Sequence, residues 1–336
     1  MKPLSVQASH LRCVASLTEE IEGDVNMNTL RIRLFGKFQA ELEGRVLKDL
    51  DALKVQELFC YLLLYRDRPH HREALSGLFW GDSETTQSRK HLRQALWQLQ
   101  LALNSGPDKL QEVPVAIESD WVSITPSLNF WLDVQVFDET LLRTRGIPGQ
   151  ALDLGQAQAL KEAAQLYCGD LLEGCYQDWC LYERERLQNA YLDLLDKLME
   201  YAETRAEYEE GLEYGAKILR YDRARERTHY RLMRLYYLAN DRAGALRQYQ
   251  RCVAALDQEL GVKPSQRTIS LCEQIQADRV DGLDWAADRS SGPSAHPESV
   301  SSLLNHLSTL RTKLAALQYQ VDQELRALEE ALGHLH

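Results

Sequence analysis

The sequence lacks any long uninterrupted hydrophobic run. No stretch approaches the ~20 consecutive apolar residues that cross a bilayer. The N-terminus has no basic segment leading into an apolar run with a small-residue cleavage site. We therefore expect a soluble, cytoplasmic protein with no membrane partner.

The local motifs of common enzymes are also missing. There is no glycine-rich phosphate loop, no zinc-ligand spacing and no GxSxG nucleophile turn. Scattered Asp and Glu residues are typical of the solvated faces of helices. We expect no enzymatic activity, no cofactor and no metal.

Cysteine is sparse, with seven residues and no CxxC pair. An odd number without such pairs fits a reducing compartment better than a disulfide framework. The closest cluster, Cys168, Cys175 and Cys180, could be a metal or redox site, but its spacing matches no zinc pattern. All three lie in or beside apolar helical stretches, which favours buried structural thiols.

The charge is acidic overall but unevenly distributed. The chain has 39 Lys and Arg against 50 Asp and Glu, a formal net charge of -11. Residues 30 to 126 carry 13 of each sign, whereas residues 127 to 336 carry 24 basic and 33 acidic residues. A uniformly acidic surface repels phosphate, so the neutral segment is the candidate nucleic-acid reader.

Residues 30 to 126 follow the element order of a winged helix with an extra N-terminal sheet. Alternating apolar residues from Leu30 to Leu47 predict a small antiparallel sheet. The next segments predict three helices and a β-hairpin, at Leu53 to Tyr65, Arg72 to Phe79, Glu84 to Asn104, Val113 to Ile117 and Trp121 to Ile124. Ser83 is the expected N-cap of the third helix.

The third helix carries the candidate DNA-binding residues. Its Leu92, Leu96, Leu99 and Leu103 share one buried face. The opposite side is polar and basic, and we predict DNA contacts from Gln87, Ser88, Arg89, Lys90, Arg93 and Gln94. Ser88, Arg89, Lys90 and Arg93 are the first candidates, because a helix in the major groove contacts DNA chiefly through its first half. A basic stripe of this kind also occurs on helices that simply face solvent. Because this helix directly precedes a β-hairpin, we favour the interpretation that it binds DNA.

Three side chains have competing interpretations: Trp97 on the third helix, and His70 and His71, which open the second helix. Trp97 could contact phosphate, but a large aromatic residue more often packs on a neighbouring element, which we expect here. His70 and His71 could bind phosphate or metal. Adjacent residues point to different helix faces, so capping or exposed positions are expected for both.

From Asp133 the chain is helical for about 145 residues. Helices are predicted at Val134 to Thr144, Gly155 to Cys168, Trp179 to Glu203, Ala206 to Leu219, Arg225 to Leu238, Arg242 to Leu260 and Ser265 to Ala277. A shift of 34 residues, the tetratricopeptide period, aligns Gly211 with Ala245. We expect these two residues where helices approach closely, while Tyr236 replaces a small residue of the repeat.

The C-terminal segment has the pattern of a short coiled coil. Leu307, Leu314, Val321, Leu328 and Leu335 recur every seven residues, with a companion row at Leu303, Leu310 and Leu317. The predicted dimer seam is Leu307, Leu310, Leu314, Leu317, Val321, Leu328 and Leu335. The alternative is that this apolar face folds back on the helical domain.

The predicted fold class is therefore mainly α. The predicted organisation has five parts: a flexible extension (1–29), a winged helix of α+β type (30–126), a tetratricopeptide-like helical domain (127–280), a linker (281–298) and a coiled-coil helix (299–336).

Several of these segments resemble the SARP family of bacterial activators. The resemblance rests on the segments Leu30 to Gly36, Arg72 to Asp82, Arg89 to Leu96, Leu132 to Val134, Arg225 to Tyr236, Ala243 to Tyr249 and Glu259 to Ser265. It covers roughly residues 30 to 278 and implies a winged helix followed by a bacterial transcriptional activation domain of tetratricopeptide-like helices.

The resemblance implies binding to direct repeats in double-stranded DNA near a promoter and recruitment of RNA polymerase holoenzyme. It places major-groove contacts on Ser88, Arg89, Lys90 and Arg93, and minor-groove contacts on the wing. The wing tip here, Glu118 to Asp120, is acidic, which argues against insertion between phosphates.

Two functions remain open from the sequence. The first is a sequence-specific DNA-binding regulator, acting as a homodimer near promoters. The second is an interaction protein whose helical domain binds a peptide or a small effector such as a nucleotide second messenger, with a winged helix that does not bind DNA directly.

Overall fold

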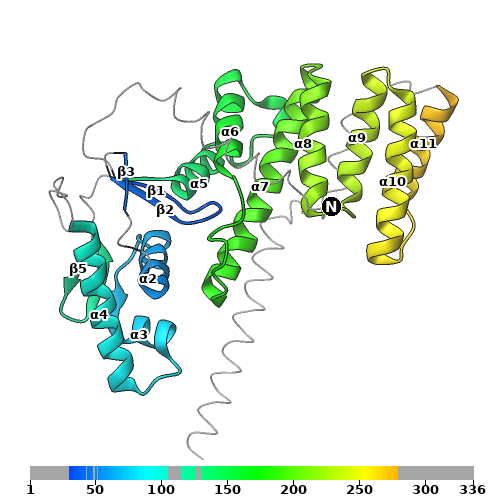
Figure 1. Ribbon diagram of the computed structural model, residues 1–336. Coiled ribbons are helices and arrows are strands. Elements are labelled where there is room, and N and C mark those ends of the chain that lie inside the picture. The colour runs from blue at the N-terminus through cyan, green and yellow to red at the C-terminus, as the bar shows by residue number, and fades with distance from the viewer. Residues whose placement is uncertain are drawn as a thin grey trace, which may run out of the picture. The chain divides into compact units, whose positions relative to one another are not determined.

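The computed structural model describes residues 30–42, 44–47, 50, 52–104, 115–125 and 130–278, and these ranges are mainly helical with two small sheets. The predicted extension (1–29), linker (281–298) and coiled-coil helix (299–336) lie outside the described residues. Among the described helices, none is long and apolar enough to cross a membrane. Figure 1 shows the elements in chain order.

A four-stranded sheet opens the described chain. Its order is β3-β2-β1-β7, and the strands are β1 (Leu30–Arg33), β2 (Gln39–Leu42), β3 (Arg45–Val46) and β7 (Phe130–Leu132). The antiparallel part was predicted. The sequence analysis missed β7, which pairs parallel to β1 with Ile32 opposite Leu132.

The winged helix follows this sheet. Its elements are α2 (Leu53–Leu64), β4 (His70–His71), α3 (Arg72–Trp80), α4 (Thr85–Asn104), β5 (Val115–Glu118) and β6 (Trp121–Ile124). The second sheet has the order β4-β6-β5. Buried leucines of α4 pack on α2 and α3, with Leu92, Leu96, Leu99 and Leu103 at most 1% exposed. This face confirms the predicted apolar stripe.

His71 caps the N-terminus of α3, which was one of the two expected roles, capping or exposure. Its Nδ1 accepts a hydrogen bond of 3.3 Å from the backbone N–H of Glu73. His70 is buried instead, with Nε2 2.9 Å from the carbonyl oxygen of Tyr65. Both residues form β4, which the sequence analysis had assigned to the start of a helix.

Asp133 ties the first sheet to the helical region. Its carboxylate accepts backbone N–H bonds from Leu34, Phe35 and Val134 at 2.7 to 2.9 Å. Burial raises the pKa of this carboxyl to about 6, and the three N–H donors oppose that shift. The end of β1 and the start of the following helix are thereby held by one side chain.

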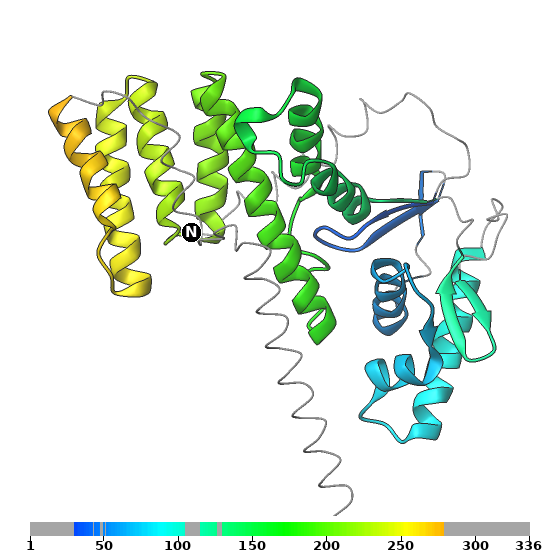
Figure 2. The same cartoon turned by 180° about the vertical axis from the view of Figure 1, so that it is seen from behind.

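The helical region consists of consecutive helices packed against one another. They are α5 (Asp133–Arg143), α6 (Leu154–Leu166), α7 (Asp178–Thr204), α8 (Tyr208–Tyr221), α9 (Glu226–Leu238), α10 (Arg242–Leu260) and α11 (Gln266–Ala277). From α7 onward, each helix packs on the next, and Figures 1 and 2 show α8 to α11 side by side from opposite directions. The predicted helix count and order for this region are confirmed.

Small residues stand where the helices approach closely, as predicted. A Cβ on Gly211 would lie 2.9 Å from a methyl carbon of Leu235, so the missing Cβ leaves room for that side chain between α8 and α9. Ala245 of α10 is fully buried.

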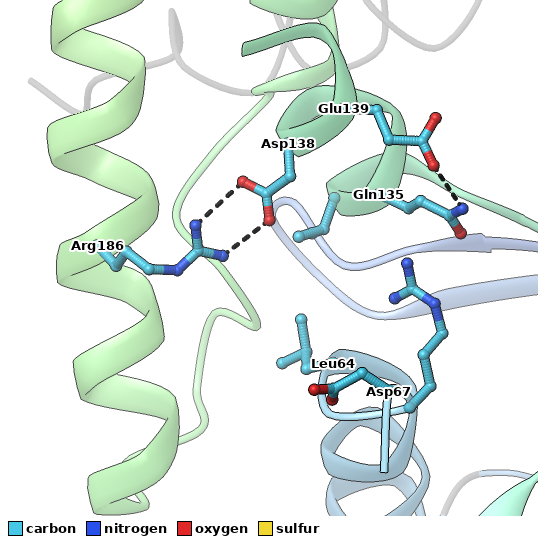
Figure 3. A pocket seen from close by; sticks show the side chains of 8 residues that line it. Leu64, Asp67, Gln135, Asp138, Glu139 and Arg186 are labelled. Carbon is cyan, nitrogen blue, oxygen red and sulfur yellow. Dashed lines mark hydrogen bonds and ion pairs between the residues drawn. The ribbon is translucent and has the colours of Figure 1, made fainter. Parts of the chain in front are cut away.

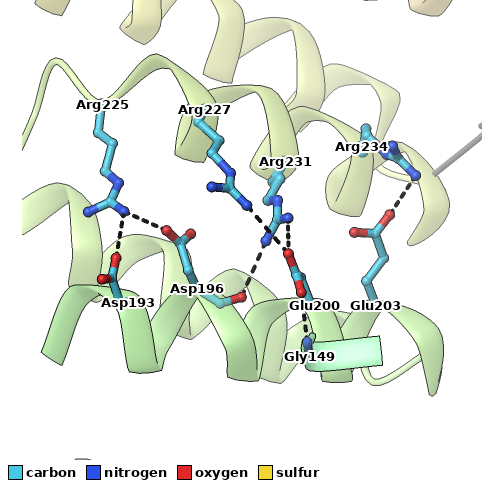
Figure 4. A network of polar contacts seen from close by, with 9 residues as sticks. All are labelled: Gly149, Asp193, Asp196, Glu200, Glu203, Arg225, Arg227, Arg231 and Arg234. Atoms are coloured by element: carbon cyan, nitrogen blue, oxygen red, sulfur yellow. Dashed lines mark hydrogen bonds and ion pairs between the residues drawn. The ribbon is translucent and has the colours of Figure 1, made fainter. Parts of the chain in front are cut away.

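An ion-pair ladder joins α7 to α9 (Figure 4). Arg225 pairs with Asp196 at 2.6 Å, and Arg234 pairs with Glu203 at 2.8 Å. Between these pairs, Arg231, whose side chain is 3% exposed, pairs with Glu200. Buried charges are costly unless paired, so the ladder fixes the register of the two helices.

The expectation for the cysteine cluster was right for two residues of three. Cys175 and Cys180 are buried, whereas Cys168 is exposed and the prediction for it was wrong. Within the described ranges, no group of three His, Cys, Asp or Glu side chains could hold a metal ion.

Candidate nucleic-acid interface

The exposed side of α4 brings most of the predicted DNA contacts together. Gln87, Arg89, Lys90, Arg93 and Gln94 are all exposed. The spacing of Arg89 and Arg93 places them one turn apart on one stripe, with Lys90 and Gln94 alongside. The stripe lies in the first half of the helix, where a helix in the major groove makes its base contacts.

Ser88 is not on this surface. It is 4% exposed, and its hydroxyl donates a hydrogen bond of 2.7 Å to the carbonyl oxygen of Trp80. The hydroxyl also lies 3.2 Å from the carbonyl oxygens of Ser83 and Glu84. Ser88 therefore stabilises the turn between α3 and α4. The prediction that its side chain is presented for a DNA contact was wrong, because the hydroxyl is buried in that turn.

A carboxylate of α3 restrains one of the candidate arginines. Glu73 accepts a hydrogen bond of 2.5 Å from Nη2 of Arg89, and both side chains are more than half exposed. This hydrogen bond holds the pKa of Glu73 below its usual range. The side chain of Arg89 is therefore positioned by a carboxylate of α3.

Trp97 extends the stripe instead of packing on a neighbour. Its side chain is 61% exposed, so the expectation of packing was wrong. Leu101, one turn further, is 52% exposed. The signal was present in the sequence: Arg89, Arg93, Trp97 and Leu101 follow a four-residue spacing and share one face.

The wing is the hairpin of β5 and β6. Its tip residues Glu118, Ser119 and Asp120 are exposed, and Ser119 has a φ of +53°. Arg72 lies against the tip, where its N–H donates to the carbonyl oxygen of Asp120 at 2.8 Å. The surface of the tip is acidic, which agrees with the expectation that this wing does not insert into the minor groove between phosphates.

A small pocket of about 260 Å³ lies where α2, α5 and α7 meet (Figure 3). Arg186 of α7 binds both carboxylate oxygens of Asp138 of α5, at 3.0 and 2.9 Å. It also donates to Glu183 at 2.7 Å, and Glu183 accepts the hydroxyl of Tyr65 at 3.0 Å. These contacts link the end of α2 to the helical region. We therefore infer that the charged side chains of this pocket stabilise the fold and do not bind a ligand.

Comparison with known proteins defines the class. Residues 132–276 match the family described as "Bacterial transcriptional activator domain". No curated protein matches the chain in a sequence search. The matched range starts at the last residue of β7 and ends in α11. Residues 132–276 therefore carry a bacterial transcriptional activator domain. In the structure this domain follows a winged helix, which is the order that the resemblance to the SARP family implied.

One solved structure similar to this chain is that of Mycobacterium tuberculosis EmbR in complex with a low affinity phosphopeptide. The two share 18% sequence identity with a TM-score of 0.61, and the match covers 75% of this chain and 66% of the EmbR chain. At this identity the match supports the fold, which is the predicted one.

Proposed function

We propose that this protein is a sequence-specific DNA-binding regulator that activates transcription near promoters by recruiting RNA polymerase. The observation that carries the proposal is the exposed stripe of Arg89, Lys90 and Arg93 on the second helix of a helix-turn-helix that precedes a β-hairpin. Guanidinium groups suit guanine edges and phosphates, and Gln94 adds a donor and an acceptor for adenine.

The surroundings of α4 support this role. Its buried leucines fix the helix on α2 and α3, and the Ser88 hydroxyl locks the preceding turn. A reading helix held in this way loses little conformational entropy on binding. Residues 30 to 126 have no net positive charge, so a single copy gains little from long-range attraction to phosphate.

We further propose that two copies act together on direct repeats. The heptad positions Leu307, Leu314, Val321, Leu328 and Leu335 supply the seam in this proposal. Linking two weak readers raises the affinity through effective concentration, which offsets the missing positive charge.

Selection of bound sequences from a random pool of duplex DNA tests the function. We expect enrichment of a repeated half-site and a footprint that covers it. The Arg89→Ala/Arg93→Ala chain should give neither, because it loses the two guanidinium groups of the stripe.

Arg143→Ala is the matched control. Arg143 is an exposed arginine of α5, far in sequence from the stripe, and it pairs with Glu139 at 3.7 Å. This variant should select the same half-site as the unchanged chain. If the double variant also selects it with the same footprint, the assignment of α4 is wrong.

A further inference from the structure

A second polar site lies in the helical domain, in a pocket between α8, α9 and α10. Its volume is about 430 Å³, within the range of small-molecule sites. Both α8 and α10 pack on α9, and each of the three helices contributes lining residues. We name it the α8–α10 pocket.

Cationic side chains line this pocket without a carboxylate among the lining residues. The cations are Arg220 at the end of α8, Arg223 just after it, and Arg251 of α10. Arg223 approaches Glu259 at 3.8 Å, but its side chain is 69% exposed, so solvent screens the pair. Three guanidinium groups on one concave surface create a local positive potential in a chain with a net charge of -11.

The floor of the pocket is a buried network of hydrogen bonds around His229 and Gln248. Nε2 of His229 lies 2.8 Å from the carbonyl oxygen of Arg223, and Nδ1 lies 2.8 Å from Nε2 of Gln248. His229 and Gln248 are each 2% exposed. Arg251 donates to the amide oxygen of Gln248 at 3.3 Å.

These hydrogen bonds orient one of the three arginines, Arg251, before any ligand arrives. Burial lowers the pKa of His229 below its ordinary value, which favours the neutral imidazole. A neutral ring donates from Nε2 to the Arg223 carbonyl and accepts at Nδ1 from the Gln248 amide. The same amide then presents its oxygen to Arg251, which preorganises one side of the site.

The remaining wall is apolar and partly aromatic. Leu212, Leu219 and Leu232 line it together with Tyr236, the tyrosine that replaces a small residue of the repeat. Gly244 of α10 makes room for this ring, because a Cβ there would lie 2.8 Å from Cδ1 of Tyr236. The pocket thus combines an anion-binding end with a surface for a flat or apolar body.

We propose that the α8–α10 pocket binds a phosphorylated small molecule with a flat body, the chemistry of a nucleotide. The phosphate pairs with Arg220, Arg223 and Arg251, since planar guanidinium groups bind phosphate oxygens in pairs. The flat body lies against Tyr236 and the leucines. This inference concerns a surface separate from α4 and does not rest on DNA binding.

Isothermal titration of the full chain at low ionic strength tests the inference. The probes are AMP, GMP, adenosine, guanosine and triglutamate. We expect at least one of the 5′-nucleotides to bind and both nucleosides to fail. Arg220→Gln/Arg251→Gln should weaken nucleotide binding by about tenfold or more, because it removes two charge-assisted partners of the phosphate.

Two controls separate this site from other basic surfaces. Arg247→Gln changes an exposed arginine of α10 that pairs with Asp241 at 3.6 Å and does not line the pocket. Arg93→Gln changes the stripe on α4. Both variants should bind the nucleotide as the unchanged chain does.

Three outcomes would overturn the inference. They are the absence of binding by both nucleotides, undiminished binding by the Arg220→Gln/Arg251→Gln chain, and binding of triglutamate without binding of nucleotides. The last result would assign the pocket to an acidic peptide. Thermal unfolding of each variant without ligand checks that the exposed substitutions leave the fold intact.

Discussion

At the scale of single residues, Asp133 does more than its position at the start of a helix suggests. Three backbone N–H groups from two elements converge on its carboxylate. The carboxyl is 2% exposed, so no water can replace it readily.

We predict that Asp133→Ala lowers the free energy of unfolding by about 3 to 5 kcal/mol, since it leaves buried donors unpaired. Urea unfolding measures the change. Asp153→Ala is the comparison, because Asp153 caps α6 through the N–H of Gln156 at a more exposed position. That variant should lose about 1 kcal/mol. Equal losses of unfolding free energy in the two variants would show that the three hydrogen bonds of Asp133 stabilise the fold no more than an ordinary helix cap does.

His229 gives the stability of the helical domain a pH dependence. Burial lowers its pKa below the ordinary value of 6.5. Below pH 6.5 the unfolded chain binds a proton that the folded chain does not, so stability falls as the pH falls.

We predict that the melting temperature of the unchanged chain falls more between pH 7.5 and pH 5.5, values on either side of the ordinary pKa of 6.5, than that of His229→Gln. The variant is less stable at every pH because it loses a hydrogen bond, but the difference between the two chains should shrink in acid. Carboxyl groups with raised pKa values, such as Asp133, are common to both chains and cancel. A difference that is constant with pH would contradict the prediction.

At the scale of elements, a side chain of α3 positions one of the exposed arginines of α4. Glu73 of α3 binds Arg89 in this structure, so the proposed contact of Arg89 with DNA requires this ion pair to open. The carboxylate of Glu73 is exposed, and the other hydrogen bonds of this residue, to His71 and Ser76, are made by its backbone.

We predict that Glu73→Gln binds the selected DNA about two- to fivefold more tightly, because the variant releases Arg89 from an exposed ion pair. Fluorescence anisotropy measures the affinity. Glu139→Gln removes a carboxylate that pairs with Arg143 on α5 and should change nothing. Weaker binding by Glu73→Gln would mean that the ion pair holds Arg89 in its binding geometry.

Elements with strong local signals could be predicted from the sequence, and elements made by distant pairing could not. The sequence predicted α10 with its bounds, Arg242 to Leu260, and the structure ends this helix at Gly261 in the left-handed region. The strand β7 has three residues and pairs with β1 across 100 positions, as Leu30 opposite Phe130 shows. No local sequence pattern can reveal such a pairing.

The site showed the same division. Side-chain type and helical spacing predicted the exposure of Arg89, Lys90 and Arg93. The direction of the Ser88 hydroxyl depends on the turn that precedes the helix, and a polar residue at that position looks the same in sequence whether it faces DNA or a carbonyl oxygen. The α8–α10 pocket joins residues of three helices and was not predicted, although Tyr236 marked it as unusual.

At the scale of the whole molecule, the two proposed sites divide the chain. The reading stripe lies in a segment of zero net charge, and the α8–α10 pocket lies in the acidic helical domain. Neither site shares a residue with the other, so each can be removed by substitution while the other remains.

The proposed dimer is a property of the full chain. We predict that a chain that ends at Ala287 is a monomer by light scattering and binds a two-repeat DNA much more weakly than the full chain, because it loses the heptad seam and with it the effective concentration of the second copy. Full-length protein measured at the same concentration is the control. An unchanged mass would place the dimer seam elsewhere or show that none exists.

The central claim is that α4 reads DNA through its arginine stripe. The most direct test is the affinity for the selected DNA as a function of salt concentration, compared between the unchanged chain and Arg89→Ala/Arg93→Ala. We predict that the double variant binds at least about tenfold more weakly. The slope of log affinity against log salt should fall by about 1 for each of the two arginines that contacts a phosphate, and so by up to about 2. The same affinity and the same slope in both chains would contradict the claim.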